Sequence, residues 1–160
     1  MVATFGWIEF LGTASTTATP TNLNLGSTLA ANLAPSTYPI TAGTHSYEKW
    51  VKMRFSGTFT RIDNIQFWKS AGAYVTGEII NWTGSRTTYA TPTNSASSYS
   101  TTPVPTSDPG TANVSIGGSL TGSLTSAGDS DFIVLQASVT SAASAGATNT
   151  KTFTGQYDEV

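Results

Sequence analysis

A strict alternation of apolar and charged residues in the middle of the chain constrains the fold most. Val51, Met53 and Phe55 alternate with Lys52 and Arg54, which is the period-two pattern of a strand with one buried side. No segment shows an equally clear helical period. The best helix candidate, residues 26–33, allows one or two turns at most. The pattern therefore predicts a β protein.

Further runs of β-branched and aromatic residues predict more strands. Residues 58–61 and 65–69 are read as two successive antiparallel strands, and residues 131–139 as a strand buried on both faces. The other candidates are residues 74–80 and 151–157 and, more weakly, residues 4–11 and 113–124. About seven or eight strands are typical of a sandwich. The predicted fold class is all-β: an antiparallel, jelly-roll-like β-sandwich with long Ser/Thr/Pro-rich loops.

The length of 160 residues fits a single domain, which we predict over residues 1–160. Residues 1–36 form an extended N-terminal arm in this interpretation. Residues 91–110 form a long loop, since prolines at this density prevent a central strand. These prolines are Pro92, Pro103, Pro105 and Pro109. A loop of about 20 residues in a compact domain is usually functional or supported by a partner, so it is a candidate contact arm.

The composition is poor in charge. Charged residues make up 10% of the chain, against about 25% in ordinary domains, while Ser and Thr make up about 30%. The formal net charge of −2 leaves no basic excess to neutralise phosphates. Apolar runs also stay below the roughly 18 residues of a membrane helix. We therefore expect neither a nucleic-acid partner nor a membrane partner.

The chain offers few groups for catalysis. Its single histidine, His45, lies in a turn-like stretch, there is no Gly-x-Ser-x-Gly pattern, and Cys is absent. Stable zinc sites need several His or Cys ligands. We expect that the protein is not an enzyme and that it has no catalytic residues, cofactor or metal.

The acidic residues favour structural roles. Glu78 lies inside a predicted strand, where an ion pair with a strand Lys or Arg is the favoured interpretation over one half of a glycosidase pair. Asp129 and Asp131 alternate as in some calcium loops, but the later acidic ligands are missing. We therefore predict a turn that enters a strand at this point.

Aromatic side chains on strands are more often core than sugar platforms. Trp82 is the least core-like of them, because it lies between Asn81 and Thr83 and beside Gly84. It is the candidate glycan contact if the protein binds carbohydrate.

Four stretches, residues 22–27, 38–59, 62–68 and 153–160, together resemble a family of small virion proteins of tailed bacteriophages. The resemblance implies a capsid decoration, or cement, protein with a jelly-roll-like sandwich. It also implies a homotrimer on the outer surface of the capsid, with the major capsid protein as partner.

Uncharged, hydrogen-bonding surfaces suit such a position, because buried unpaired charges are costly while hydroxyl groups can be satisfied across an interface. The candidate interface residues are Phe5, Trp7 and Phe10 in the apolar N-terminal segment, together with Pro103 and Pro105 in the long loop. The same N-terminal aromatics could instead belong to the first strand of the core.

Other functions remain open at this point. The main alternative is a carbohydrate- or receptor-binding module of a phage tail or fibre, since such modules share the all-β fold and surface aromatics. A tail or connector protein of the same virion and an enzyme with an unfamiliar site are further alternatives.

Overall fold

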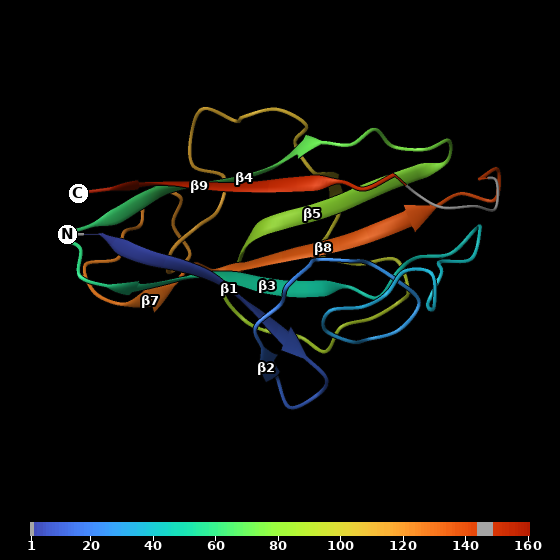
Figure 1. The fold of residues 1–160 in the computed structure, drawn as a ribbon, viewed down its shortest axis with the longest axis horizontal. Helices are drawn as coiled ribbons and strands as arrows, with labels where there is room; N and C mark the ends of the chain where they lie inside the picture. Colours follow the sequence, from blue (N-terminus) through green and yellow to red (C-terminus); the bar gives the residue numbers. More distant parts are fainter. Residues whose placement is uncertain (1, 144–148) are drawn as a thin grey trace.

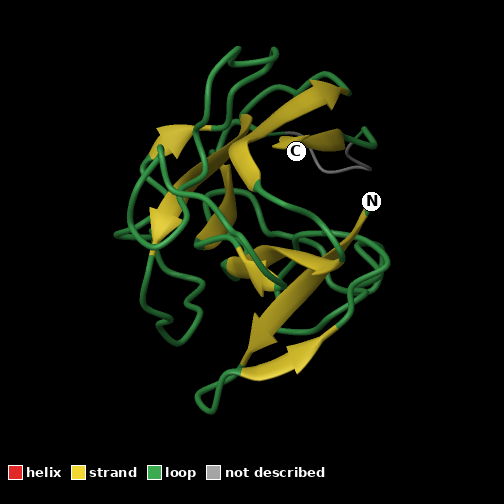
Figure 2. Cartoon of the chain, turned by 90° about the vertical axis from the view of Figure 1, so that its left-hand side faces the viewer, coloured by secondary structure: helices red, strands yellow, loops and turns green. Residues whose placement is uncertain are grey.

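The computed structural model describes residues 2–143 and 149–160, which contain nine strands and no helix (Figures 1 and 2). No helix that could span a membrane therefore occurs in these residues. The strands are β1 (Ala3–Leu11), β2 (Thr16–Ala18), β3 (Lys49–Gly57), β4 (Ile62–Ala71), β5 (Glu78–Arg86), β6 (Thr102–Pro103), β7 (Gly128–Asp129), β8 (Phe132–Val139) and β9 (Thr152–Glu159).

The strands form two antiparallel sheets. The large sheet has the order β2-β1-β3-β8-β5-β6, with β7 paired to β3, and the small sheet consists of β4 and β9. Side chains from the facing sides of both sheets make one core cluster. The predicted antiparallel sandwich is therefore confirmed, although its strands are divided unequally between the sheets. The jelly-roll connectivity stays a prediction.

The core lies between the sheets and follows the predicted alternation. Val51, Met53 and Phe55 on β3 are at most 1% exposed, whereas Arg54 on the opposite face is exposed. The small sheet contributes Phe67, whose ring stacks on that of Phe153 at 5.4 Å and an angle of 10°. The strand predicted around residues 50–55 is thus correct in position and orientation.

The outer face of the large sheet is covered as well. Trp50 is fully buried there beside Phe132 and Val134. Tyr89 and Tyr99, from the segment between β5 and β6, each place their rings 5.3 Å from that of Trp50. This cover explains why β8 is buried on both faces, as the sequence predicts.

The prediction of two successive strands after Gly57 is wrong in detail. Residues 58–61 lie outside the strands, and β4 joins the small sheet instead of pairing with β3. Gly57 has φ of +86°, a conformation that favours glycine and ends β3. Phe59 then enters the core and is 8% exposed. The chain thus crosses between the sheets at this point.

Three other predicted elements need correction. Residues 74–77 precede β5 instead of beginning it, because Gly77 turns the chain with φ of +81°. Residues 26–33 form no helix. Residues 113–124 contain no strand, and their turn is fixed by the buried carboxylate of Asp131, which accepts hydrogen bonds from Ser115 Oγ at 2.5 Å and Gly118 N at 2.7 Å.

The two predicted arms are packed parts of the domain. Within residues 2–36, β1 pairs with β3 over eight residue pairs, and Leu33 is only 4% exposed. The long loop at residues 91–110 contains β6, which pairs with β5, and Val104, which is 1% exposed. Neither segment extends from the molecule, because each carries apolar side chains that the core buries.

Trp82 belongs to the core, contrary to the prediction of a surface position. It is 7% exposed, and its ring lies 5.6 Å from that of Phe67. The register pairs Trp82 with Leu135, so both side chains face the small sheet. The flanking polar residues misled the prediction, because on a strand they face the opposite side.

Replacing Trp82 by alanine is expected to lower the free energy of unfolding by about 3–5 kcal/mol, since the substitution leaves a cavity in the core. Tyr38→Ala is the control, because Tyr38 is 43% exposed and should change stability by less than about 0.5 kcal/mol. Urea unfolding of both variants provides the measurement. Equal, small losses would contradict the core position.

Candidate functional site

The two sides of the sandwich differ, and one of them is closed. Val104 N donates to Ile80 O at 3.0 Å, and Lys69 N donates to Pro105 O at 2.8 Å, so residues 103–105 bridge the large and small sheets. Pro103 and Pro105, both predicted interface residues, therefore belong to this closed side. Pro103 is exposed and Pro105 is half-buried. Their role as contacts stays a prediction.

Asn113 completes the closure. Its Oδ1 accepts from Phe67 N at 2.8 Å, and its Nδ2 donates to Phe67 O at 2.9 Å. One side chain thus satisfies both backbone groups at the outer edge of β4, as a neighbouring strand would.

The opposite side, formed by the outer edges of β1 and β9, is open, and we call it the open side. β9 pairs only with β4, while β2 covers β1 only from Glu9 to Leu11. The two edges contact each other through aromatic rings, since the ring centroid of Phe5 on β1 lies 5.9 Å from that of Tyr157 on β9, and through a hydrogen bond from Ala3 N to Glu159 Oε1 at 2.8 Å. β1 begins and β9 ends at the same end of the molecule (Figure 1).

The hydrogen bonds of β4 show in which direction the backbone N–H and C=O groups of β9 point. Phe67 pairs with Gly155 but directs its own N–H and C=O to Asn113. In an antiparallel ladder such a pair carries no mutual bonds, so the backbone groups of Gly155 point to the open side. Val160 and Arg61 exchange two backbone hydrogen bonds, so the backbone groups of Val160 point toward β4. Counting back from Val160, the odd-numbered residues of β9 again point to the open side.

The outward backbone groups on β9 are therefore those of Phe153, Gly155, Tyr157 and Glu159. None of them has a hydrogen bond to another residue within the described ranges. An unpaired strand edge is a template for another strand.

Apolar side chains accompany these free edges. Phe5 is 36% exposed, and Val2 and Val160 are 79% and 62% exposed. Together with Tyr157 they form what we call the terminal patch. An exposed apolar patch beside open strand edges is typical of a protein-binding surface.

The structure separates the three predicted N-terminal aromatics. Phe5 and Trp7 face the small sheet, whereas Phe10 lies on the outer face, with its ring 4.8 Å from that of Phe132. Only Phe5 of the three is strongly exposed. Tyr157 and Val160 were missed by the prediction. The sequence feature that could have identified them is the alternation in the last strand, because a strand without proline or lysine between residues 152 and 159 is an unprotected edge.

A shallow hollow of about 260 Å³ lies on the open side between β1, β9 and residues 20–23. Trp7 and Phe153 supply its rings. Several of its polar groups are engaged, since Asn22 Oδ1 accepts from Asn24 N at 3.0 Å and Lys151 Nζ donates to Glu78 Oε2 at 2.6 Å. This leaves mainly Asn22 Nδ2 and the Thr152 hydroxyl for a ligand. The hollow therefore offers apolar contact more than polar recognition.

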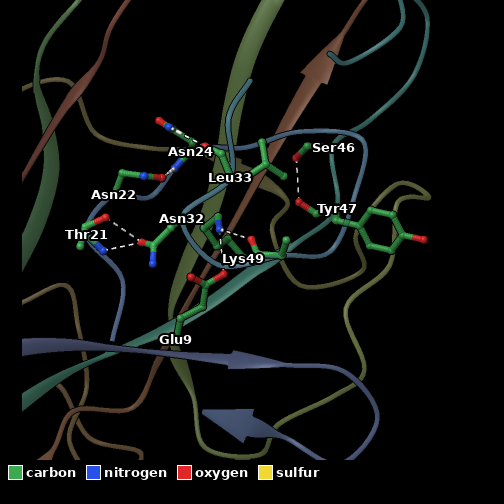
Figure 3. Close-up of polar contacts among 10 residues, drawn as sticks. Glu9, Thr21, Asn22, Asn24, Asn32, Leu33, Ser46, Tyr47 and Lys49 are labelled. Atoms are coloured by element: carbon green, nitrogen blue, oxygen red, sulfur yellow. Dashed lines mark hydrogen bonds and ion pairs between the residues drawn. The ribbon is translucent and has the colours of Figure 1, made fainter. Parts of the chain in front are cut away.

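The segment beside this hollow is held by polar contacts (Figure 3). Asn32 Oδ1 accepts from both Thr21 N and Thr21 Oγ1, at 2.6 and 2.9 Å. Lys49 Nζ pairs with Glu9 Oε1 at 2.7 Å and also donates to Ala30 O at 3.3 Å. A buried ion pair thus ties the segment to β1 and β3.

The Glu9–Lys49 pair is buried at both ends, with side chains 1% and 6% exposed. Burial raises the pKa of Glu9 above its ordinary value of 4.5, and Lys49 partly offsets this rise by hydrogen bonding and charge. Burial is therefore the stronger influence on the carboxylate, which depends on Lys49 to remain charged.

The candidate chemical groups have structural partners. His45 Nδ1 lies 2.9 Å from Ser138 Oγ. Glu78 forms an ion pair with Lys151, which directly precedes β9, whereas the sequence predicted such a pair with a lysine or arginine on a strand. Asp129 pairs with Arg54 at 2.7 Å, and Asp131 fixes its neighbouring turn. Within residues 2–143 and 149–160, no group of three or more His, Cys, Asp or Glu could hold a metal ion.

Comparison with known proteins adds no relative: no family model, curated protein or solved structure matches this chain. Its function must therefore be inferred from its own residues and geometry.

Lys49→Met should lower the free energy of unfolding by about 3–5 kcal/mol at neutral pH, because it leaves the Glu9 carboxylate buried and unpaired. The loss should shrink near pH 3, which lies well below the ordinary pKa of 4.5, so that Glu9 is protonated in both the folded and the unfolded state. Stability contributed by a carboxyl group with a raised pKa falls as pH rises above 4.5. Urea unfolding at both pH values measures the difference.

The double variant Glu9→Gln/Lys49→Met is the control, since it removes both charges. It should be more stable than Lys49→Met at neutral pH and should show little change in this difference between the two pH values. An equal loss for Lys49→Met at both pH values would contradict the role assigned to the pair.

Proposed function

We propose that this protein is a structural virion component that decorates and stabilises a phage capsid through protein–protein contacts. The open side carries this proposal, because its unpaired strand edges and terminal patch form a binding surface on an otherwise well-covered sandwich. The expected partner is the major capsid protein, and the expected location is the outer surface of the capsid. The resemblance implies a trimer, whereas the free edge of β9 favours a two-fold pair, as argued below.

All seven Lys and Arg side chains make contacts within the molecule, which is consistent with a surface that binds neighbours through uncharged groups. Four form ion pairs, two lie over aromatic rings, and Lys69 donates to Gly72 O and lies over the Tyr74 ring. The ion pairs involve Lys49, Arg54, Arg61 and Lys151, and the ring contacts involve Lys52 and Arg86. Such an arrangement favours a protein neighbour over a polyanion.

A rigid sandwich with weak individual contacts suits an icosahedral shell. Many copies bind the same shell, so modest interfaces combine through multivalency. Hydroxyl groups on the surface can be satisfied by neighbours without the cost of burying charge. Catalysis is not part of this proposal.

The glycan-binding alternative loses its candidate residue, because Trp82 lies in the core. The hollow beside Trp7 and Phe153 is a further place where a sugar ring could stack. Lys151 and Asn22 Oδ1 already have partners within the chain, so the hollow offers few polar groups to sugar hydroxyls, and we favour the structural function.

Capsids that lack this protein should bind it in a co-sedimentation assay, and Phe5→Ser should reduce the bound amount by about tenfold, since the central ring of the terminal patch is lost. Tyr38→Ser is the matched control, because Tyr38 is similarly exposed but lies between β2 and β3. Melting temperatures verify that both variants are folded.

Equal binding of wild type and Phe5→Ser would contradict the function of the terminal patch. Absence of capsid binding, together with glycan-array binding lost in Trp7→Ala, would support the carbohydrate alternative instead.

A further inference from the structure

We propose that a second copy of this chain pairs with the free edge of β9, antiparallel and around a two-fold axis at Gly155. The proposal assigns the β9 edge of the open side to a second copy, so that the capsid contact falls to the exposed Val2, Phe5 and Val160 of the terminal patch. It does not depend on attachment to a capsid. It concerns how the small sheet is completed.

The small sheet is incomplete in a specific way. It has two strands, an arrangement that is only marginally stable without further support. The outer edge of β4 is closed by Asn113 and by Leu124, which exchanges two bonds with Ile62. Among the residues that the structure describes, only the β9 edge of this sheet remains open, so a further strand can add there alone.

β9 lacks most of the features that protect an edge strand, since its charged residues, Asp158 and Glu159, lie at its end. Edge strands are commonly interrupted by proline, lysine or a bulge, but residues 152–159 contain neither proline nor lysine. The register shifts in this sheet add residues to β4: Asp63 and Gln66 are three apart, while their partners Asp158 and Gln156 are two apart. β9 itself is therefore regular over its length.

β1 is a poorer template, although it also faces the open side. Its Ala3 N–H donates to Glu159 Oε1 at 2.8 Å, and β2 covers the strand from Glu9 onward. This leaves the carbonyl of Ala3 and the outward groups of Phe5 and Trp7. β9 offers four residues with free backbone groups, so it is the favoured edge.

The sequence of β9 is complementary to itself. With the axis at Gly155, Phe153 lies opposite Tyr157 of the second copy, and Thr154 lies opposite Gln156. Aromatic pairs stabilise adjacent strands, and like charges directly opposite destabilise them. This register puts no like charges opposite each other, because Asp158 faces Thr152 of the second copy.

The free backbone groups allow few other registers. They belong to odd-numbered residues, so a bonded pair must join two odd-numbered residues. Moving the axis to Gln156 also satisfies this condition, but it places Phe153 opposite Glu159 and loses both aromatic pairs. The axis at Gly155 is therefore preferred.

Pairing would complete a four-stranded sheet across two copies and cover apolar surface. Phe153 and Tyr157 are both half-buried in one copy and face the large sheet. The second copy would cover the sides of these rings, beside the exposed Phe5. Backbone bonds and apolar burial would then act together.

The mass of the purified full chain in solution tests the proposal. We expect twice the 16.6 kDa of one chain. Thr154→Glu/Gln156→Glu should weaken self-association by about tenfold or more, because it places a carboxylate at each of these two positions opposite a carboxylate of the second copy. Thr154→Lys/Gln156→Glu is the matched control and should retain the dimer, since it places opposite charges there. Both variants lose the Thr154–Ser70 hydrogen bond, so this loss cancels.

Cysteine cross-linking tests the register in a chain that has no native cysteine. Thr154→Cys/Gln156→Cys should give a disulfide-linked dimer on mild oxidation, because residues 154 and 156 face each other as a closely spaced pair. Gln156→Cys alone should give none. Cross-linking by the single variant would overturn the register in favour of the axis at Gln156.

A monomer or a trimer in solution, or equal weakening by both charge variants, would overturn the proposal. A dimer that fails to bind capsids would support this pairing and refute the capsid function, so the two proposals fail separately.

Discussion

Two hydrogen bonds between the Asn113 side chain and the backbone of Phe67 decide which side of the sandwich is closed. A sheet of two strands has two edges, and each edge must be paired, covered or solvated. The Asn113 side chain covers the β4 edge in place of a strand. Val104 and Pro105, beside it, join that edge to β5. The closed side thus leaves β9 as the place where the fold can be extended.

The large sheet is buried on both faces because long segments between the strands cover its outer face. The segment between β5 and β6 covers Trp50 with Tyr89 and Tyr99, and it also supplies hydrogen-bond partners for the buried Gln136. A chain with few charged residues can cover sheet faces in this way, because Ser and Thr backbone and side-chain groups satisfy buried polar atoms at low cost. The composition and the loop-rich fold are therefore linked.

The sequence predicted the strands whose side chains alternate clearly, such as β3 and β8. It failed where the neighbours of a residue decide its position. Trp82 looked exposed because Asn81 and Thr83 flank it, yet the register with Leu135 buries it. The long loop looked like an arm because its prolines exclude a central strand, but they permit the edge strand β6.

The candidate site was predictable only in part, for the same reason. Phe5 was identified from the apolar N-terminal segment, but alternation alone could not show that Phe10 faces the other side of the large sheet. Tyr157 and Val160 become significant only because β9 lies beside β1. Which two edges meet is a property of the sheet order, and that order depends on contacts between distant residues.

The distribution of charge and the geometry of the open side both indicate a surface that binds through short-range contacts. Four of the seven Lys and Arg side chains are paired with carboxylates, and the formal net charge is only −2, so attraction at long range is weak. Recognition must then come from short-range contacts, namely backbone hydrogen bonds at a strand edge and apolar side chains around it. Both are concentrated along β9 and the terminal patch. A neighbour that presents a matching strand and apolar rings fits this surface, and a second β9 presents both.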